Sequence, residues 1–245
     1  WLVSSWSIGA LVLGRLYQSK DLSLISTTEA VIVGAAIWLA AWGVMLHFAV
    51  NFQALHILLC LLPCLLLLGR KSSIHNELRS RLNAAQDWMR SIPFWAWVGG
   101  LIVVGWVLRW ASFPSMGYDD HAHHLRIWTE LLTQERYTFD ISTQIWSVAP
   151  FTVDLLHAGL SLMAGGDARS AMNLGLAILL LLLMAGILRR LNTPVWTQWL
   201  LIVLMATTPM LGNLLLTLQT ELTLAVMALA GMRLVIDANG GWRGQ

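Results

Sequence analysis

The chain has 245 residues, of which 57% are hydrophobic and 11% are charged, with a formal net charge of +2 at pH 7. An ordinary soluble domain has roughly 25% charged residues, so this composition excludes a water-soluble globular protein. Apolar runs on this scale must be buried, which also excludes a disordered chain. The sequence predicts an all-α polytopic membrane protein.

Apolar runs recur along the chain, and a helix that crosses a bilayer needs about 20 such residues. They cover residues 2–13, 30–50, 52–69, 92–108, 168–188 and 195–232. The last run is too long for one helix, and the turn-forming residues Thr207, Thr208, Pro209 and Gly212 divide it into a hairpin. We therefore expect about seven spans. We also expect chain before Trp1, because the first apolar run has already begun there.

Basic residues separate by side when the connections are assigned alternately to the two faces of the membrane. One face receives Arg15, Lys20, Arg70, Lys71, Arg79, Arg81, Arg90, Arg189, Arg190, Arg233 and Arg243. The other receives Arg109, Arg126, Arg136 and Arg169. The positive-inside rule makes the first face cytoplasmic. We expect N-terminal spans with a basic cytoplasmic loop at 1–91, a membrane core at 92–236, and a cytoplasmic tail at 237–245 that continues further.

The external connection 112–167 is unusually long and acidic. It contains seven of the 13 acidic residues of the chain, and loops of this length in compact proteins are usually functional. A helical pattern begins at Asp120, with Leu125, Trp128 and Leu132 on one stripe. A second mildly apolar segment covers 150–164. We expect both segments to be helices that lie in the membrane interface.

This layout resembles that of membrane GT-C glycosyltransferases, in particular the lipid-linked-sugar branch with protein mannosyltransferases and aminoarabinose transferases. The resemblance covers about residues 92–235. The matching pieces are Tyr118-Asp119-Asp120, the segment 146–156, Asp167-Ala168-Arg169-Ser170-Ala171 before the helix 173–188, and Thr208-Pro209 followed by Glu221. The chain departs from the family at Asp120, where Glu is usual, and at Val148-Ala149-Pro150, where Lys-Pro-Pro or His-Pro-Pro is common.

The resemblance implies transfer of a sugar, with inversion, from a polyprenyl-phosphate donor to a lipid, glycan or protein acceptor. The reaction would take place at the periplasmic face of a bacterial inner membrane. Asp119 is implied as the general base, and Asp120 either shares that role or orients a donor phosphate through a metal. One of the two residues alternatively only caps the following helix. A transporter or flippase of a lipid-linked substrate is the alternative function, although the internal repeats that it predicts are not seen.

Basic and imidazole side chains follow the acidic pair. His121, His123, His124 and Arg126 are candidates for binding the donor phosphate, with polar interface residues as the alternative. Asp120 and His124 are four residues apart on the predicted helix, as are Asp119 and His123, a spacing that can hold a divalent metal. No other cofactor is predicted. Nucleic-acid binding is excluded, because the basic residues form no basic face.

Three further residues are candidates for substrate binding. Asp154 and His157 are three apart, which also fits a local pair or a solvated helix face. Glu221 comes about ten residues after the external turn, roughly 15 Å down its helix. An acid at that depth must face protein or a water-filled cavity, in a functional or a structural role. Besides donor and acceptor, the expected partners are membrane lipids.

Overall fold

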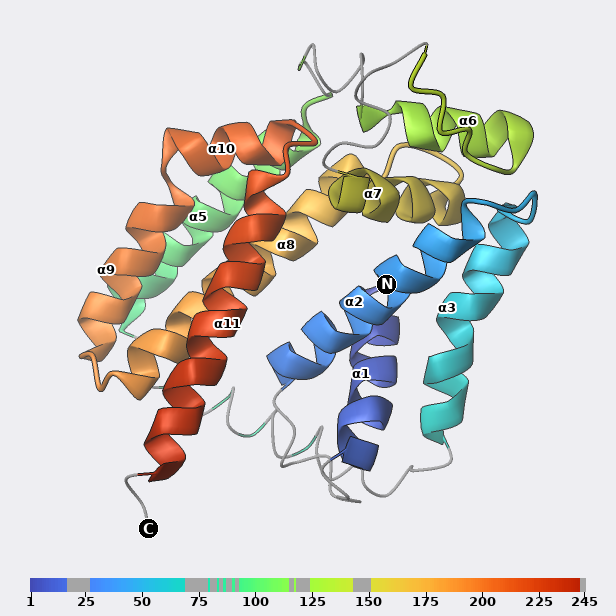
Figure 1. Ribbon diagram of the computed structural model, residues 1–245. Helices are drawn as coiled ribbons and strands as arrows, with labels where there is room; N and C mark the ends of the chain where they lie inside the picture. The colour runs from blue at the N-terminus through green and yellow to red at the C-terminus, as the bar shows by residue number, and fades with distance from the viewer. Residues whose placement is uncertain are drawn as a thin grey trace.

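The computed structural model is helical throughout the residues that it describes (Figure 1). These are 1–16, 27–68, 93–114, 117, 124–142 and 151–242, together with Arg79, Asn83, Gln86 and Arg90; at 27, 151, 152, 234 and 237–242 only the backbone is described. Within these ranges there are ten helices and no strand. The helices are α1 (Leu2–Leu16), α2 (Thr27–Met45), α3 (Gln53–Leu68), α5 (Phe94–Ser112), α6 (Arg126–Gln134), α7 (Phe151–Ala164), α8 (Arg169–Arg190), α9 (Val195–Ala206), α10 (Pro209–Leu216) and α11 (Glu221–Trp242).

The longer helices form a bundle with two distinct ends. Figure 1 shows α6, α7 and α10 lying across the longer helices at one end, which we call the loop end. The opposite end carries the C-terminal turns of α1 and α8, with Arg15, Arg189 and Arg190, and we call it the basic end. The two ends match the predicted separation of the external loop from the basic connections.

α8 is the central helix of the bundle. It packs against α5, α7, α9, α10 and α11. Its buried side chains include Met172, Leu176, Leu180 and Leu183, which recur at the three- and four-residue spacing of one helix face.

Proline residues set several helix boundaries, because proline restricts the preceding residue to extended backbone. Phe113, before Pro114, is extended and ends α5.

α1 and α2 approach each other until their backbones touch. A Cβ atom added at Gly9 would lie 1.8 Å from the Ala30 carbonyl oxygen, and one at Gly34 would lie 1.7 Å from that of Ser5. Small residues allow this close approach, as they do between helices in membranes. Glycine is therefore required at both crossing points.

The number of helices that can span a membrane is smaller than predicted. Among the described helices, α2, α5 and α8 are long and apolar enough to cross a membrane, and α9 with α10 makes a fourth if this bent pair is one span. The sequence predicts about seven. Length accounts for part of the difference, because α1 and α3 are apolar but have only 15 and 16 residues.

The apolar run 195–232 is broken at Thr208 and Pro209, as predicted. It forms three helices with two breaks, however, and not the predicted hairpin of two helices. The Thr208 side chain caps α10 by accepting from the Leu211 amide at 3.2 Å, with Pro209 in the first turn. The axes of α9 and α10 differ by 52°. Gly212, predicted as a turn residue, lies inside α10, and a second break at 217–220 precedes α11.

The predicted depth of Glu221 is therefore wrong. It is the first residue of α11, and its side chain is exposed. The prediction counted ten residues of one straight helix, whereas α10 crosses the bundle at the loop end before α11 begins (Figure 1). Glu221 thus lies at the same end as α6 and α7.

Candidate functional site

The helices α6 and α7, which both lie across the longer helices, form the outer layer of the loop end (Figure 1). Ile127 and Leu131 of α6 are buried, whereas Leu132 is 54% exposed, so the apolar stripe of α6 is turned from the predicted one. α7 is the second predicted helix and lies across the bundle, as expected of an interface helix (Figure 1). It packs against α2, α3, α6 and α8, and protein therefore covers much of its surface.

The two titratable residues of α7 bind partners on other elements. Asp154 is 6% exposed, and its Oδ1 lies 2.6 Å from Nδ1 of His124, which lies just before α6 begins. His157 is fully buried, and its Nε2 lies 2.7 Å from Asp167 Oδ1 before α8. The predicted local pair or solvated face is therefore wrong. The two contacts instead join one turn of α7 to the residues just before α6 and just before α8.

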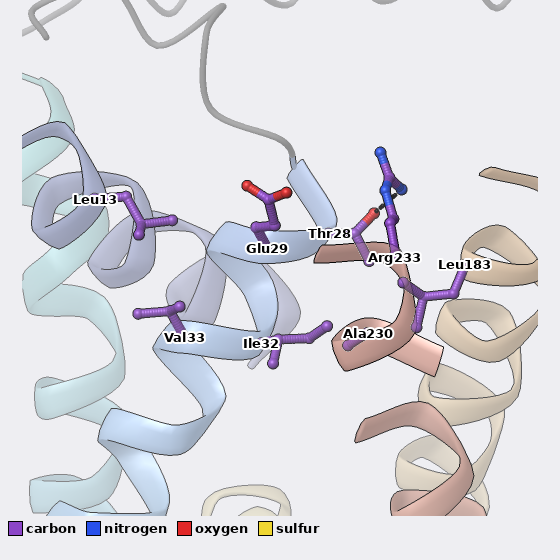
Figure 2. A pocket seen from close by; sticks show the side chains of 8 residues that line it. All are labelled: Leu13, Thr28, Glu29, Ile32, Val33, Leu183, Ala230 and Arg233. Atoms are coloured by element: carbon purple, nitrogen blue, oxygen red, sulfur yellow. Dashed lines mark hydrogen bonds between the residues drawn. The ribbon is translucent and has the colours of Figure 1, made fainter. Parts of the chain in front are cut away.

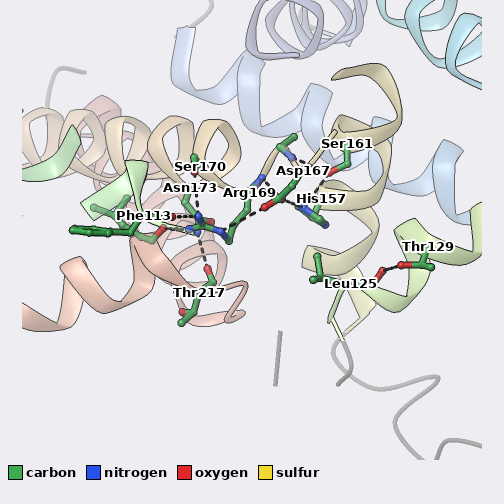
Figure 3. A network of polar contacts seen from close by, with 12 residues as sticks. Phe113, Leu125, Thr129, His157, Ser161, Asp167, Arg169, Ser170, Asn173 and Thr217 are labelled. Atoms are coloured by element: carbon green, nitrogen blue, oxygen red, sulfur yellow. Dashed lines mark hydrogen bonds and ion pairs between the residues drawn. The ribbon is translucent and has the colours of Figure 1, made fainter. Parts of the chain in front are cut away.

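A group of buried polar side chains continues from His157 into the bundle. We call His157, Ser161, Asp167, Arg169 and Asn173 the polar network (Figure 3). Ser161 Oγ lies 3.0 Å from His157 Nε2 and accepts from the Ala168 amide at 3.0 Å. Asp167 Oδ1 also accepts from the Arg169 amide at 2.9 Å. These contacts fix the turn between α7 and α8.

Arg169 is the centre of the polar network and joins three helix ends. It is 2% exposed, and its Nε lies 3.9 Å from Asp167 Oδ2. Its guanidinium donates to the Leu215 carbonyl near the end of α10 at 2.8 Å and to the Phe113 carbonyl at the end of α5. The last carbonyls of a helix lack partners within the helix, and a buried cation satisfies them well.

Asn173 completes the polar network one turn along α8. Its amide donates to the carbonyls of Leu214, Leu215 and Thr217, at 3.1, 3.2 and 2.6 Å. The Leu214 and Leu215 carbonyls belong to the last turn of α10, and the Thr217 carbonyl belongs to the break before α11 (Figure 3). The start of α8 therefore holds the elements that bring Glu221 to the loop end.

The geometry of the polar network excludes a serine nucleophile of the Ser-His-Asp type. In that arrangement the hydroxyl and the carboxylate contact opposite nitrogens of the imidazole. Here Ser161 and Asp167 both contact Nε2 of His157, while the buried Nδ1 has no hydrogen-bond partner among the described residues. The polar network therefore positions helices and contains no activated hydroxyl.

The carboxyl group of Asp167 has a lowered pKa. The hydrogen bond from His157 is the main cause, and the hydrogen bond from the Arg169 amide and the positive charge of the Arg169 guanidinium act in the same direction. Partial burial opposes them. Because the pKa is lower in the folded chain than in the unfolded chain, ionised Asp167 stabilises the fold at neutral pH.

We expect Asp167→Asn to remove part of the acid sensitivity of the fold. The stabilisation by Asp167 is complete above its ordinary pKa of 3.8 and is lost as pH falls through the lower folded value. Thermal unfolding in detergent between pH 3 and pH 7 measures this change. Glu135→Gln is the control, because Glu135 is exposed and also lies at the loop end. Parallel pH profiles for Asp167→Asn and the unmodified chain would contradict the assignment.

A cleft at the loop end lies beside the polar network. It has a volume of about 390 Å³ and is lined by Trp106, Arg109, Trp110, Phe113, Pro114 and Leu216. The rings of Trp106 and Trp110 meet edge to face with centroids 5.6 Å apart. Their buried indole N–H groups have no acceptor among the described residues. Gly212 of α10 lets the Trp110 ring approach, because a Cβ there would lie 3.1 Å from it.

The predicted site residues are only partly described by the structure. Asp119, Asp120, His121 and His123 lie outside the described residues. Of the remainder, His124 contacts Asp154, and Arg126 Nε contacts Glu130 Oε1 at 2.6 Å, a pairing that raises the pKa of Arg126. No group of three or more metal-binding side chains occurs in the described ranges.

Sequence reasoning missed the inner part of the site. It placed Arg169 among the external basic residues and in the 167–171 motif of the family resemblance, and it gave no role to Ser161 or Asn173. A signal was present, because Arg169 and Asn173 are polar residues at the start of an otherwise apolar span.

No protein-family model, curated protein or solved structure matches this chain.

Proposed function

We propose that this protein is an integral membrane glycosyltransferase of the GT-C type. It transfers a sugar from a polyprenyl-phosphate donor to an acceptor at the face of the membrane where the loop end lies. The span-length helices α2, α5 and α8 support the membrane location. The observation that carries the proposal is the cleft at the loop end, which combines a cation with aromatic rings.

The lining of the cleft suits a phosphate group attached to an apolar chain and a sugar. Arg109 lies in the last turn of α5, is exposed, and has no side-chain partner among the described residues. A guanidinium binds phosphate oxygens through two parallel hydrogen bonds. The rings of Trp106, Trp110 and Phe113 offer apolar surface to the ligand.

The acidic pair follows the cleft directly in the chain. Asp119 comes five residues after Pro114, and five extended residues span at most about 18 Å. In the proposed reaction, Asp119 takes the proton of the acceptor hydroxyl while that oxygen bonds to the anomeric carbon. The bond from that carbon to the phosphate oxygen breaks, and polyprenyl phosphate leaves with the electron pair. Direct displacement inverts the anomeric centre.

Three residues have supporting roles in this proposal. His124, fixed by Asp154, lies four residues after Asp120 and is available to the same substrate. Arg169 has a positioning role, because it holds the Phe113 carbonyl at the wall of the cleft. Should a divalent metal take part, Asp120 and His124 are the residues that would hold it.

We expect Arg109→Gln to lower kcat/KM for the donor by roughly 10- to 100-fold, mainly through KM, because a charge-assisted hydrogen bond to phosphate is lost. The assay uses the full-length protein in membranes and a panel of polyprenyl-phosphate sugars. Arg136→Gln is the matched control, since Arg136 is an exposed arginine that follows α6 at the same end. Equal kinetics of the two variants would exclude Arg109 as the phosphate ligand.

A further inference from the structure

A second cavity lies at the basic end of the bundle. It has a volume of about 130 Å³ and lies between α1, α2, α8 and α11 (Figure 2). A single water needs roughly 10–15 Å³ by this measure, so a larger group fits. Leu183 in its wall comes 14 residues after Arg169 on α8, about 21 Å away by helix rise. The cavity is therefore separate from the polar network and from the cleft.

One edge of this cavity is polar and the rest is apolar. Figure 2 shows the Glu29 carboxylate and the Arg233 guanidinium pointing to the same side, with Thr28 between them. Arg233 Nη1 donates to Thr28 Oγ1 at 3.4 Å. The guanidinium lies against α8 at Gly186, where a Cβ would be 2.8 Å from Nη1. The structure thus holds one cation and one anion at the edge of an apolar cavity.

We propose that this cavity binds the headgroup of a zwitterionic phospholipid that carries a primary amine, as phosphatidylethanolamine does. Arg233 binds the phosphate, because a guanidinium is the side chain best suited to its oxygens. Glu29 accepts hydrogen bonds from the ammonium group, which a quaternary amine cannot donate. The apolar wall, which includes Ile32, Leu183 and Ala230, receives the first carbons of an acyl chain.

The position of the cavity agrees with a lipid headgroup. Glu29 lies in the first turn of α2, at the end of the bundle where Arg15 and Arg189 complete α1 and α8. Basic side chains at helix ends mark the depth of lipid phosphates. The carboxylate of Glu29 disfavours purely anionic headgroups through like-charge repulsion. This inference rests on the proposed membrane location, but it is independent of the proposed glycosyl transfer.

Lipid retention by the full-length protein tests the assignment. The protein is purified from vesicles that contain equal amounts of phosphatidylethanolamine, phosphatidylcholine and phosphatidylglycerol, and bound lipid is quantified by native mass spectrometry. We expect phosphatidylethanolamine to be enriched roughly tenfold over the other two, as one charge-assisted hydrogen bond predicts. Glu29→Gln should remove the preference, and Arg233→Gln should remove all three lipids. Equal retention of the three by the unmodified chain would overturn the proposal.

Three controls test whether the lipid is held inside this cavity. Arg189→Gln changes an exposed charge at the same end, outside the cavity, and should retain phosphatidylethanolamine fully; a loss equal to that of Arg233→Gln would indicate surface charge alone. Ala230→Leu fills the cavity and should displace the lipid at an unchanged unfolding temperature. Equally strong competition by soluble O-phosphoethanolamine would overturn a lipid ligand in favour of the free phosphoamine.

Two further measurements keep the proposals distinguishable. Extraction of the chain from membranes by alkaline carbonate would disprove the membrane location on which the lipid site rests. Glu29→Gln should leave sugar transfer unchanged, because Glu29 lies at the end of the bundle opposite the cleft. Absence of sugar transfer with normal lipid selectivity would remove the proposed function and leave this site intact.

Discussion

Asp119→Asn is expected to abolish sugar transfer by the full-length protein while leaving its membrane insertion unchanged. A general base contributes roughly 10²- to 10⁴-fold to a rate, and an amide cannot take the proton of the acceptor hydroxyl. The substitution keeps the shape of the side chain and can still cap a helix, so loss of activity reports on the chemistry. The measurement is single-turnover transfer from a polyprenyl-phosphate sugar in reconstituted vesicles.

Two variants make this test specific. Asp120→Asn should reduce transfer less if Asp120 orients a phosphate, and added Mg²⁺ should change its kinetics if a metal takes part. Glu135→Gln alters an exposed acidic residue of the same external connection and should leave transfer within about twofold, as expected of a surface substitution. Turnover retained by Asp119→Asn would exclude Asp119 as the base. Loss in all three variants would instead point to the net charge of the connection.

Arg169→Met is expected to lower the free energy of unfolding by roughly 3 kcal/mol, because buried carbonyls lose a charged donor. The Leu215 carbonyl loses a 2.8 Å hydrogen bond, and the Phe113 carbonyl loses its contact as well. Asp167 simultaneously loses the nearby cation. The measurement is unfolding of the purified protein in mixed detergent micelles, followed by helical circular dichroism.

Two control variants distinguish the hydrogen bonds of the Arg169 guanidinium from its positive charge. Arg169→Lys keeps the charge but cannot reach two helix ends at once, so it should recover only part of the loss. Arg189→Met removes an exposed arginine from the other end of α8 and should change stability by less than about 0.5 kcal/mol. An unfolding midpoint of Arg169→Met equal to that of the unmodified chain would show that the buried guanidinium adds no net stability.

The amino-acid sequence was sufficient for features that depend on local properties. The apolar windows 30–50, 52–69, 92–108 and 168–188 correspond to α2, α3, α5 and α8. These helices were predictable because a long run of apolar residues is itself the signal for a helix that must be buried. The break at Thr208 and Pro209 was also predictable, since capping and proline geometry act within a few residues. Both helices of the external connection were also expected, because the spacing of apolar residues along a segment is a local property of the sequence.

The tertiary structure alone decided the partners and positions of the polar groups. Asp154 and His157 share one turn of α7, yet they bind His124 and Asp167, 30 and 10 residues away. Arg169 holds Phe113, 56 residues earlier. Glu221 reached the loop end because α10 bends across the bundle. Local spacing carries no information on such pairs, since they form only where packing brings separate helix ends together and leaves buried polar groups to satisfy one another.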